Sequence, residues 1–303
     1  MEKIKYIITI LFGIFLLSFS SCDVIEGPYL IDDNLIPIDS STIFVRKVLI
    51  EDFTGHRCAN CPAAAVELVA LQEFYGDNII GVAIHPNSSY SRPNSLTSTT
   101  YTYDFRTQFG EDINNIFEFT SFPNGMVNRI GFDTQHQLGK DEWADVVQSE
   151  LEKDPIFGIT LNSDVSEGNG TIEVDIEVLT DLNENYNVVV CLTESGIIQW
   201  QKDNTAGDIE NYEHNHVLRS ILNSATGESI GNSFIDGDLW EKSYTVNISS
   251  LEDFNSEFSL NNLSMGNGNC KGWVENKMEV VVYIYNTSNF EIVQVEEIHL
   301  TNH

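Results

Sequence analysis

The sequence predicts an α/β domain followed by an all-β domain. Near the N-terminal end a strand, a helix and a second strand follow one another within about 40 residues, which is the pattern of a βαβ unit. Beyond Pro155, short runs alternate between apolar and charged residues, which is typical of strands with one buried face. A length of 303 residues also suggests about two domains. We therefore expect residues 43–154 to form the first domain and residues 155–303 the second.

The N-terminus predicts a secretion signal that ends at a lipid attachment site. A short basic start precedes an apolar run from Ile7 to Phe19, which is too short to span a bilayer as a helix. Ser20-Ser21-Cys22 follows, and small residues directly before a cysteine resemble a bacterial lipobox. We expect residues 1–21 to be a signal peptide, Cys22 to carry the lipid, and residues 22–42 to be a flexible tether. An ordinary secretory peptide is the alternative.

Charge and cysteine content limit the function further. The chain has 15 basic and 46 acidic residues, for a formal net charge of −31. Such a field repels phosphate backbones and anionic lipid head groups, so we expect no nucleic-acid partner and membrane contact through the N-terminal lipid only. Five cysteines are too few for a disulfide scaffold. Export would place the four after Cys22 where disulfides persist.

The first domain is expected to alternate strands and helices. Residues 44–53 predict a strand that leads into Cys58-Ala59-Asn60-Cys61-Pro62, and residues 63–75 predict a helix with one apolar face. The nearly all-apolar run Ile79–Ile84 predicts a buried parallel strand. Later elements are expected as a helix over 101–109, a strand over 126–130 and a helix over 140–151.

The second domain is expected to be an antiparallel β-sandwich. Thr171–Val178 alternates apolar with charged residues, as a half-buried strand does. Similar runs occupy residues 157–161, 186–192, 244–248, 278–285 and 292–298. Many short strands with few helices favour a sandwich.

Cys58 and Cys61 are the strongest chemical signal. Two cysteines three positions apart at a strand–helix junction can close a disulfide, and the helix N-terminus favours a thiolate. A C-x-x-C beside a βαβ pattern is a thioredoxin-like signature. We expect Cys58 to attack a substrate disulfide and Cys61 to resolve the mixed disulfide, with His56 and Arg57 adding positive charge. An inert disulfide or half of a zinc site, which needs about four ligands, are the alternatives.

Pro123 is the second element of this prediction. Thioredoxin-like domains place a cis-proline opposite the C-x-x-C, and Phe122-Pro123 precedes an apolar strand at the corresponding place. We expect a cis bond and a role for Pro123 in shaping the substrate groove. An ordinary turn proline is the alternative.

Four stretches carry a family resemblance. They are Glu51-Asp52-Phe53-Thr54-Gly55-His56-Arg57-Cys58-Ala59-Asn60-Cys61-Pro62-Ala63-Ala64, Phe122–Gly125, Thr193–Ile198 and Tyr212–Arg219. Together they resemble the outer-membrane-protein-28-related lipoproteins of Bacteroidetes-type bacteria. The resemblance implies a thioredoxin-like N-terminal domain, a β-rich C-terminal domain and an outer-membrane lipid anchor. It implies no settled activity, since members are described loosely as outer-membrane proteins or adhesins. Arg57 stands where thioredoxins carry an aromatic residue.

A group of polar residues between positions 212 and 219 also invites a functional interpretation. His214 and His216 would share one face of a strand and could meet one metal ion, but no third ligand is evident, so we expect no metal. With Tyr212 and Arg219 they could instead order a domain interface or line a cleft.

Cys191 and Cys270 are the remaining cysteines. They either form a second disulfide, which would close a long loop and stabilise the fold, or remain as free thiols.

The sequence favours one function and leaves one alternative. The first is a lipid-anchored envelope protein that exchanges disulfides with exported protein or peptide thiols through Cys58, Cys61 and Pro123, without a dissociable cofactor. The alternative is a non-catalytic outer-membrane binding or adhesin-type protein in which Cys58–Cys61 is a structural disulfide. The sequence leaves the oligomeric state open.

Overall fold

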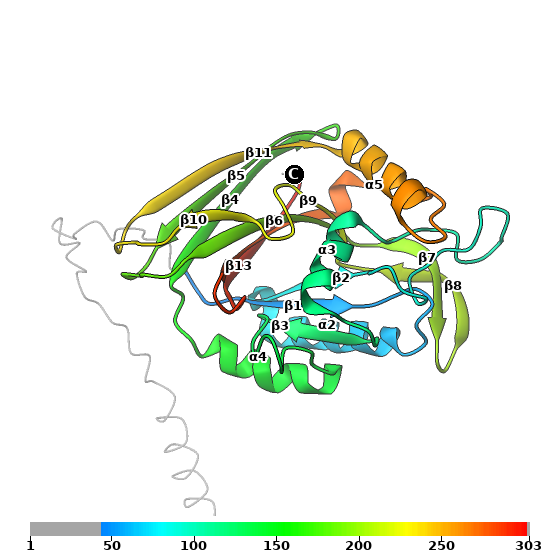
Figure 1. The fold of residues 1–303 in the computed structure, drawn as a ribbon, viewed down its shortest axis with the longest axis horizontal. Coiled ribbons are helices and arrows are strands. Elements are labelled where there is room, and N and C mark those ends of the chain that lie inside the picture. Colours follow the sequence, from blue (N-terminus) through cyan, green and yellow to red (C-terminus); the bar gives the residue numbers. More distant parts are fainter. Residues whose placement is uncertain (1–43, 302–303) are drawn as a thin grey trace, which may run out of the picture. The chain divides into compact units, whose positions relative to one another are not determined.

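The structure, a computed structural model, describes residues 44–301 (Figure 1). The predicted signal peptide, Cys22 and the predicted tether over residues 22–42 lie outside the described residues. The fold is rich in β-strands, most of which pair antiparallel, and contains few helices. The β-rich part of the fold prediction is therefore confirmed. No helix among residues 44–301 has both the length and the apolar character that crossing a membrane requires.

The predicted βαβ unit is present. Strand β1 (Val48–Phe53) pairs in parallel with β2 (Ile79–Ile84). Helix α2 (Cys61–Tyr75) and the short 3-10 helix η1 (Gly76–Asn78) connect them. Both strands are fully buried: the nearly all-apolar run of β2 predicts this, whereas β1 also buries Glu51 and Asp52. Pro62 lies in the first turn of α2, where a helix needs no backbone N–H donor.

One eight-stranded sheet contains this unit and most of the later strands. Its order is β13 (Ile292–His299), β12 (Met278–Asn286), β6 (Tyr186–Glu194), β9 (Val217–Ile221), β2, β1 and β3 (Asn124–Val127), and β10 (Glu228–Gly231) also pairs with β6. The predicted boundary near residue 154 does not divide this sheet. Ala83 of β2 pairs with Val217 of β9, and the chain from Phe44 onward forms one compact unit.

A three-stranded sheet packs on the β6–β12 part of the central sheet. It consists of β4 (Phe157–Ser166), β5 (Asn169–Val178) and β11 (Leu239–Asn247), with β5 in the middle. Figure 1 shows it as a separate layer beside β6. The alternating apolar residues of β5, such as Ile172 and Val174, share a core with Val190 and Val282 of the central sheet. The alternation that the sequence shows therefore marks the buried face of this layer.

Helices cover both faces of the β1–β3 part of the sheet. Helices α2 and α4 (Trp143–Leu151, preceded by the 3-10 helix η2, Lys140–Glu142) pack against one face. Helix α3 (Gln108–Phe117) packs against the other. The helix expected over residues 101–109 was placed too early, because the Thr107 side chain accepts a bond from the Gly110 amide and caps the helix there.

Several elements were not expected from the sequence, among them strands β9 and β10 of the central sheet. Helix α5 (Ile248–Asn262) follows β11, and a 3-10 helix η3 (Glu275–Lys277) precedes β12. Strands β7 (Ile197–Asp203) and β8 (Gly207–His214) form a two-stranded hairpin that pairs with neither of the other sheets. The hairpin lies in the chain between β6 and β9.

Candidate functional site

Cys58 and Cys61 form the expected disulfide, with their Cα atoms 5.4 Å apart. Cys61 begins α2, and Cys58 lies in the turn between β1 and this helix. The Cys58 amide donates to the Gly55 carbonyl at 2.9 Å, which tightens the turn. Each cysteine is only 2% exposed. The pair therefore lies at the mouth of a helix, as predicted, but it is covered.

The β7–β8 hairpin provides one side of the cover. Three carbonyls of the C-x-x-C loop accept hydrogen bonds from it: His56 O from the Lys202 amide at 2.8 Å, Cys58 O from Gln201 Nε2 at 3.0 Å and Ala59 O from the Asn204 amide at 2.8 Å. The hairpin thus occupies the backbone acceptors beside Cys58 that another polypeptide strand would otherwise use.

The segment between β2 and α3 provides the other side. The Arg57 amide donates to the Tyr90 carbonyl at 2.9 Å, and Ser91 Oγ donates to the Thr54 carbonyl at 3.1 Å. This approach requires glycine at position 55, because a Cβ there would lie 2.5 Å from the Tyr90 oxygen.

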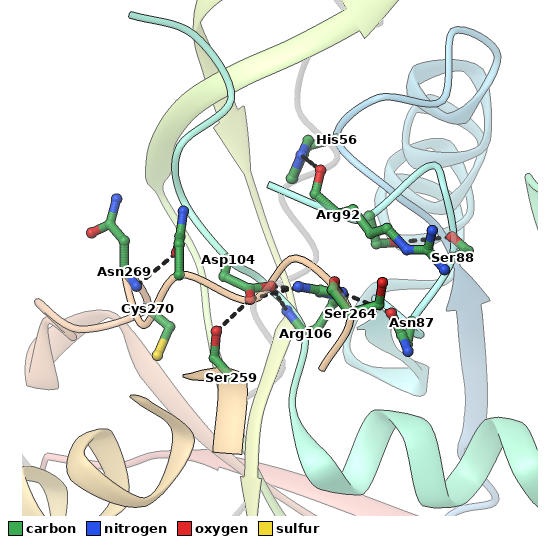
Figure 2. A network of polar contacts seen from close by, with 12 residues as sticks. His56, Asn87, Ser88, Arg92, Asp104, Arg106, Ser259, Ser264, Asn269 and Cys270 are labelled. Carbon is green, nitrogen blue, oxygen red and sulfur yellow. Dashed lines mark hydrogen bonds and ion pairs between the residues drawn. The ribbon is translucent and has the colours of Figure 1, made fainter. Parts of the chain in front are cut away.

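A buried ion pair anchors this segment (Figure 2). Arg106 donates to both carboxylate oxygens of Asp104, at 2.7 and 2.9 Å, and both side chains are fully buried. Ser259 of α5 donates to the same carboxylate at 2.6 Å, and Arg106 also donates to the Ser264 carbonyl at 2.9 Å and to Asn87 Oδ1 at 2.7 Å. Figure 2 shows these groups converging from three separate chain segments.

The two residues before Cys58 differ from each other in charge. His56 is 1% exposed, and burial, together with the nearby His214, lowers its pKa to about 3. It is therefore neutral near pH 7, and the expected positive charge at this position is wrong. Its Nε2 lies 3.3 Å from the Arg92 carbonyl. Arg57 is half-buried and donates to that carbonyl and to Asn94 Oδ1, both at 3.3 Å. Of these two residues, Arg57 is therefore the one that carries a positive charge near pH 7.

A pocket of about 210 Å³ opens beside Cys61. Its apolar wall is the first half of α2, with Pro62, Ala65, Val66, Leu68 and Val69, and its other walls come from Asp52, Thr54, Ala83, His85, Gln201 and residues 212–217. Cys61 lines this pocket and Cys58 does not. The hairpin contributes Gln201 and residues 212–214 to these walls, so both α2 and the hairpin bound the pocket, which reaches the disulfide at Cys61.

Asp52 is the buried acid of this pocket. It is 3% exposed, and its Oδ1 has no hydrogen-bond partner among residues 44–301. Burial raises the pKa of its carboxyl group to about 7. Near neutral pH the group can therefore gain or lose a proton next to the disulfide.

Three histidines share the pocket with Asp52. They are His85, His214 and His216, and each has one ring nitrogen, Nδ1, Nε2 and Nδ1 respectively, without a hydrogen-bond partner in the described chain. Burial lowers the pKa of all three, to about 4 for His214. They are neutral near pH 7 and can donate or accept according to tautomer.

Of the four residues expected to line a cleft or an interface, three do so. Tyr212, His214 and His216 line the pocket. Arg219 lies elsewhere, 3.1 Å from Glu194 and bonded to the Cys270 carbonyl at 3.0 Å. It is buried and holds the loop before β12 in place.

Pro123 directly precedes β3, at the end of the sheet where β1 finishes. The Phe122–Pro123 peptide bond is cis, which confirms the conformation that the sequence predicts. Asn124, the next residue, pairs with Phe53, the last residue of β1. The Phe122 ring packs edge-on against Tyr90, with ring centroids 5.7 Å apart. Pro123 therefore lies at the same end of the sheet as the loop that carries Cys58.

The second disulfide that the sequence left open does not form. Cys191 and Cys270 are both free and buried. Cys191 lies on β6 and packs in the core, while Cys270 lies in a loop, where its carbonyl accepts from Trp273 Nε1 at 2.8 Å. Burial raises the pKa of both thiols, to about 11 for Cys270. Within residues 44–301, no group of three or more His, Cys, Asp or Glu side chains is placed to hold a metal ion.

The sequence analysis missed three residues of the site. Asp52 could have been found, because a charged residue inside a fully buried strand is unusual. His85 follows directly after a buried strand, which is a weaker signal. Gln201 gave no local signal, because its role depends on a contact 143 positions away.

The family to which this chain is similar matches the part of the chain that follows the disulfide. The family described as "Outer membrane protein Omp28" matches residues 111–303, nearly two thirds of the chain. This chain belongs to the Omp28 family. Omp28 membership makes it an outer-membrane protein of the cell envelope. Cys58 and Cys61 precede the matched residues.

Two solved structures support the fold of this Omp28 protein, and a third is reported beside them. HBP35 of Porphyromonas gingivalis is 14% identical, with a TM-score of 0.58 over 85% of this chain and 76% of that one. A protein of Agrobacterium tumefaciens is 12% identical, with a TM-score of 0.51 over 86% and 97%. A domain of the outer membrane lipoprotein Omp28 from P. gingivalis is 17% identical over 48% and 89%, with a TM-score of 0.29. No curated protein matches the chain.

Proposed function

We propose that this Omp28-family protein is anchored by a lipid on Cys22 and exchanges disulfides with exported proteins or peptides through Cys58 and Cys61. The residues around this pair would form a thioredoxin-like domain and the residues after 154 a β-sandwich domain, with the two joined through the shared central sheet. One observation carries the proposal: Cys61, at the start of α2, lines the same pocket as Asp52, a buried carboxyl group whose pKa burial raises to about 7.

Asp52 would supply the proton chemistry that exchange requires. A disulfide that opens releases a thiolate, and a thiol that attacks must first lose its proton. A carboxyl group with a pKa of about 7 can perform both transfers near neutral pH. Arg57 and the N-terminus of α2 would favour the thiolate electrostatically, and Pro123 would orient a substrate backbone.

Single-turnover exchange by the mature chain tests this proposal. A reduced peptide with two cysteines should be oxidised by the wild-type chain, and one Cys58–Cys61 disulfide should be consumed for each peptide disulfide formed. Cys58→Ser and Cys61→Ser should abolish the oxidation, and Cys270→Ser, which removes a free thiol, should retain it. Equal oxidation by the wild type and Cys58→Ser would refute the proposal.

The burial of both sulfurs favours a second candidate function. A pair that is 2% exposed and bonded to a hairpin could be a structural disulfide in a surface-binding or adhesin-type protein. The reduction potential separates the two functions. A value below about −300 mV indicates a structural bond, and a higher value indicates a working redox pair.

A further inference from the structure

We infer that Cys61, rather than Cys58, is the sulfur that a substrate meets, and that the pocket beside it accepts an uncharged, partly apolar group. The inference rests on the proposed exchange function and reverses the order of attack that the sequence favours. It assigns the pocket lined by Cys61, Ala65 and His85 as the substrate site.

The two sides of the disulfide differ in how they are covered. On the Cys58 side, Gln201 donates to the Cys58 carbonyl, and hairpin amides donate to the carbonyls of His56 and Ala59. A substrate strand would therefore compete with the hairpin for these three carbonyls. On the Cys61 side the pocket remains open, and its outer wall carries Val66 and Val69, which are 68% and 42% exposed. Exposed valines on a surface helix suit contact with an apolar group.

The floor of the pocket requires polar partners. Among residues 44–301, Asp52 Oδ1 and one ring nitrogen each of His85, His214 and His216 find no hydrogen-bond partner. Buried polar atoms without partners are uncommon, and here the four residues that carry them all line one cavity. A ligand with an apolar body and an uncharged hydrogen-bonding end would satisfy both the helix wall and the floor.

Charge selects against an anionic ligand. The described lining of the pocket includes no lysine or arginine, and its histidines are neutral. Glu213 at the lining adds negative charge. A separate pocket of about 400 Å³ differs in this respect, because Arg57 and Lys202 are among its lining residues. An anion that approaches the disulfide through the Cys61 pocket therefore finds no positive partner.

Oxidation of a substrate at Cys61 takes two successive thiol–disulfide exchanges. A substrate thiol enters uncharged and gives its proton to the Asp52 carboxylate as its sulfur attacks Sγ of Cys61; the Cys58–Cys61 bond breaks, and Cys58 leaves as a thiolate. The substrate's second thiolate then attacks the substrate sulfur bound to Cys61, which releases the Cys61 thiolate. Two electrons pass from the substrate dithiol to the protein disulfide, and the two substrate protons end on Cys58 and Cys61.

Alkylation of single-cysteine variants tests the assignment. Cys58→Ser leaves Cys61 as a thiol, and Cys61→Ser leaves Cys58, so mature chains of both are treated with iodoacetamide or iodoacetate at a pH where the thiols are ionised. Peptide mass spectrometry reads each site, with the buried Cys191 as the internal reference. We expect iodoacetamide to modify Cys61 at least about tenfold faster than Cys58 or Cys191, and faster than iodoacetate does. Equal or faster modification of Cys58, or Cys61 no faster than Cys191, overturns the inference.

Two phenylalanine substitutions, one inside the pocket and one outside it, provide a control that does not depend on the fraction of the thiol that is ionised. Ala65→Phe, made in the Cys58→Ser chain, should slow iodoacetamide at Cys61 about tenfold, because residue 65 lines the pocket. Ala70→Phe places the same side chain at an exposed position of the same helix and should leave the rate unchanged. Equal effects of the two substitutions would overturn the inference. If Cys61 reacts as expected but the wild-type chain oxidises no peptide, the exchange function fails and the pocket assignment stands.

Discussion

Two buried polar regions flank the C-x-x-C loop, and they differ in how completely their groups are paired. Asp104 and Arg106 form a bidentate ion pair whose remaining groups bond to Ser259, Ser264 and Asn87. The pocket floor, in contrast, leaves Asp52 and three histidines with unpaired atoms. Burial of polar groups is costly unless hydrogen bonds compensate it. The first region therefore holds the structure, and the second is organised for a ligand or a proton.

The largest expected effect comes from breaking the paired region. Arg106→Ala leaves the Asp104 carboxylate buried without its partner, and we expect a loss of about 3–5 kcal/mol in the free energy of unfolding. Urea denaturation measures it. Lys153→Ala is the control, because its ion pair with Glu150 is half exposed on the lysine side and should contribute less than about 1 kcal/mol. Equal losses would contradict the contrast between buried and exposed pairs.

A substitution in the unpaired region should instead raise the free energy of unfolding. The pKa of Asp52 is raised from 3.8 to about 7, so the folded chain holds a proton that the unfolded chain has lost in this range. The contribution of Asp52 to stability is therefore favourable at low pH and falls as pH rises from about 4 to about 7. Asp52→Asn should stabilise the protein by up to about 4 kcal/mol at pH 8, and by little at pH 4.

Urea denaturation at the two pH values checks this prediction. Asp141→Asn, at an exposed carboxylate far along the chain, serves as the matched control and should show no such pH dependence. A stabilisation by Asp52→Asn that is equal at pH 4 and pH 8 would show that Asp52 does not titrate in this range.

The smallest effect is expected at the hairpin cover. Gln201→Leu removes the side-chain bond to the Cys58 carbonyl and should cost about 1–2 kcal/mol. Loss of this contact should also speed reduction of the disulfide by dithiothreitol, measured by trapping the released thiols. Gln199→Leu, on the same strand, is the control. A reduction rate unchanged by Gln201→Leu would mean that the hairpin does not limit access.

The parts of the fold that the sequence predicts well depend on local patterns. The β1–α2–β2 unit, the alternating β5 strand and the C-x-x-C at a helix start all follow from spacing within a few residues. Periodicity shows which residues are buried but not which distant partner buries them. The pairing of Ala83 with Val217, which joins the two halves in one sheet, therefore had no local signature.

The same limit applied to the site. The disulfide and the cis bond before Pro123 were predicted from motifs. The neutral state of His56 and the exposure of Cys61 to the pocket depend on groups contributed by the later hairpin and loops. Tyr212, His214 and His216 were singled out without their partners Asp52 and His85, because those residues lie on β1 and after β2.

The order of the hairpin in the chain has a consequence for biogenesis. Gln201 lies 143 positions after Cys58, the residue whose carbonyl it covers. As the polypeptide emerges during translocation, both thiols reach the oxidising compartment well before the segment that will shield them. Oxidation can therefore finish on an open nascent chain, and the late arrival of β7 and β8 closes over a bond that already exists.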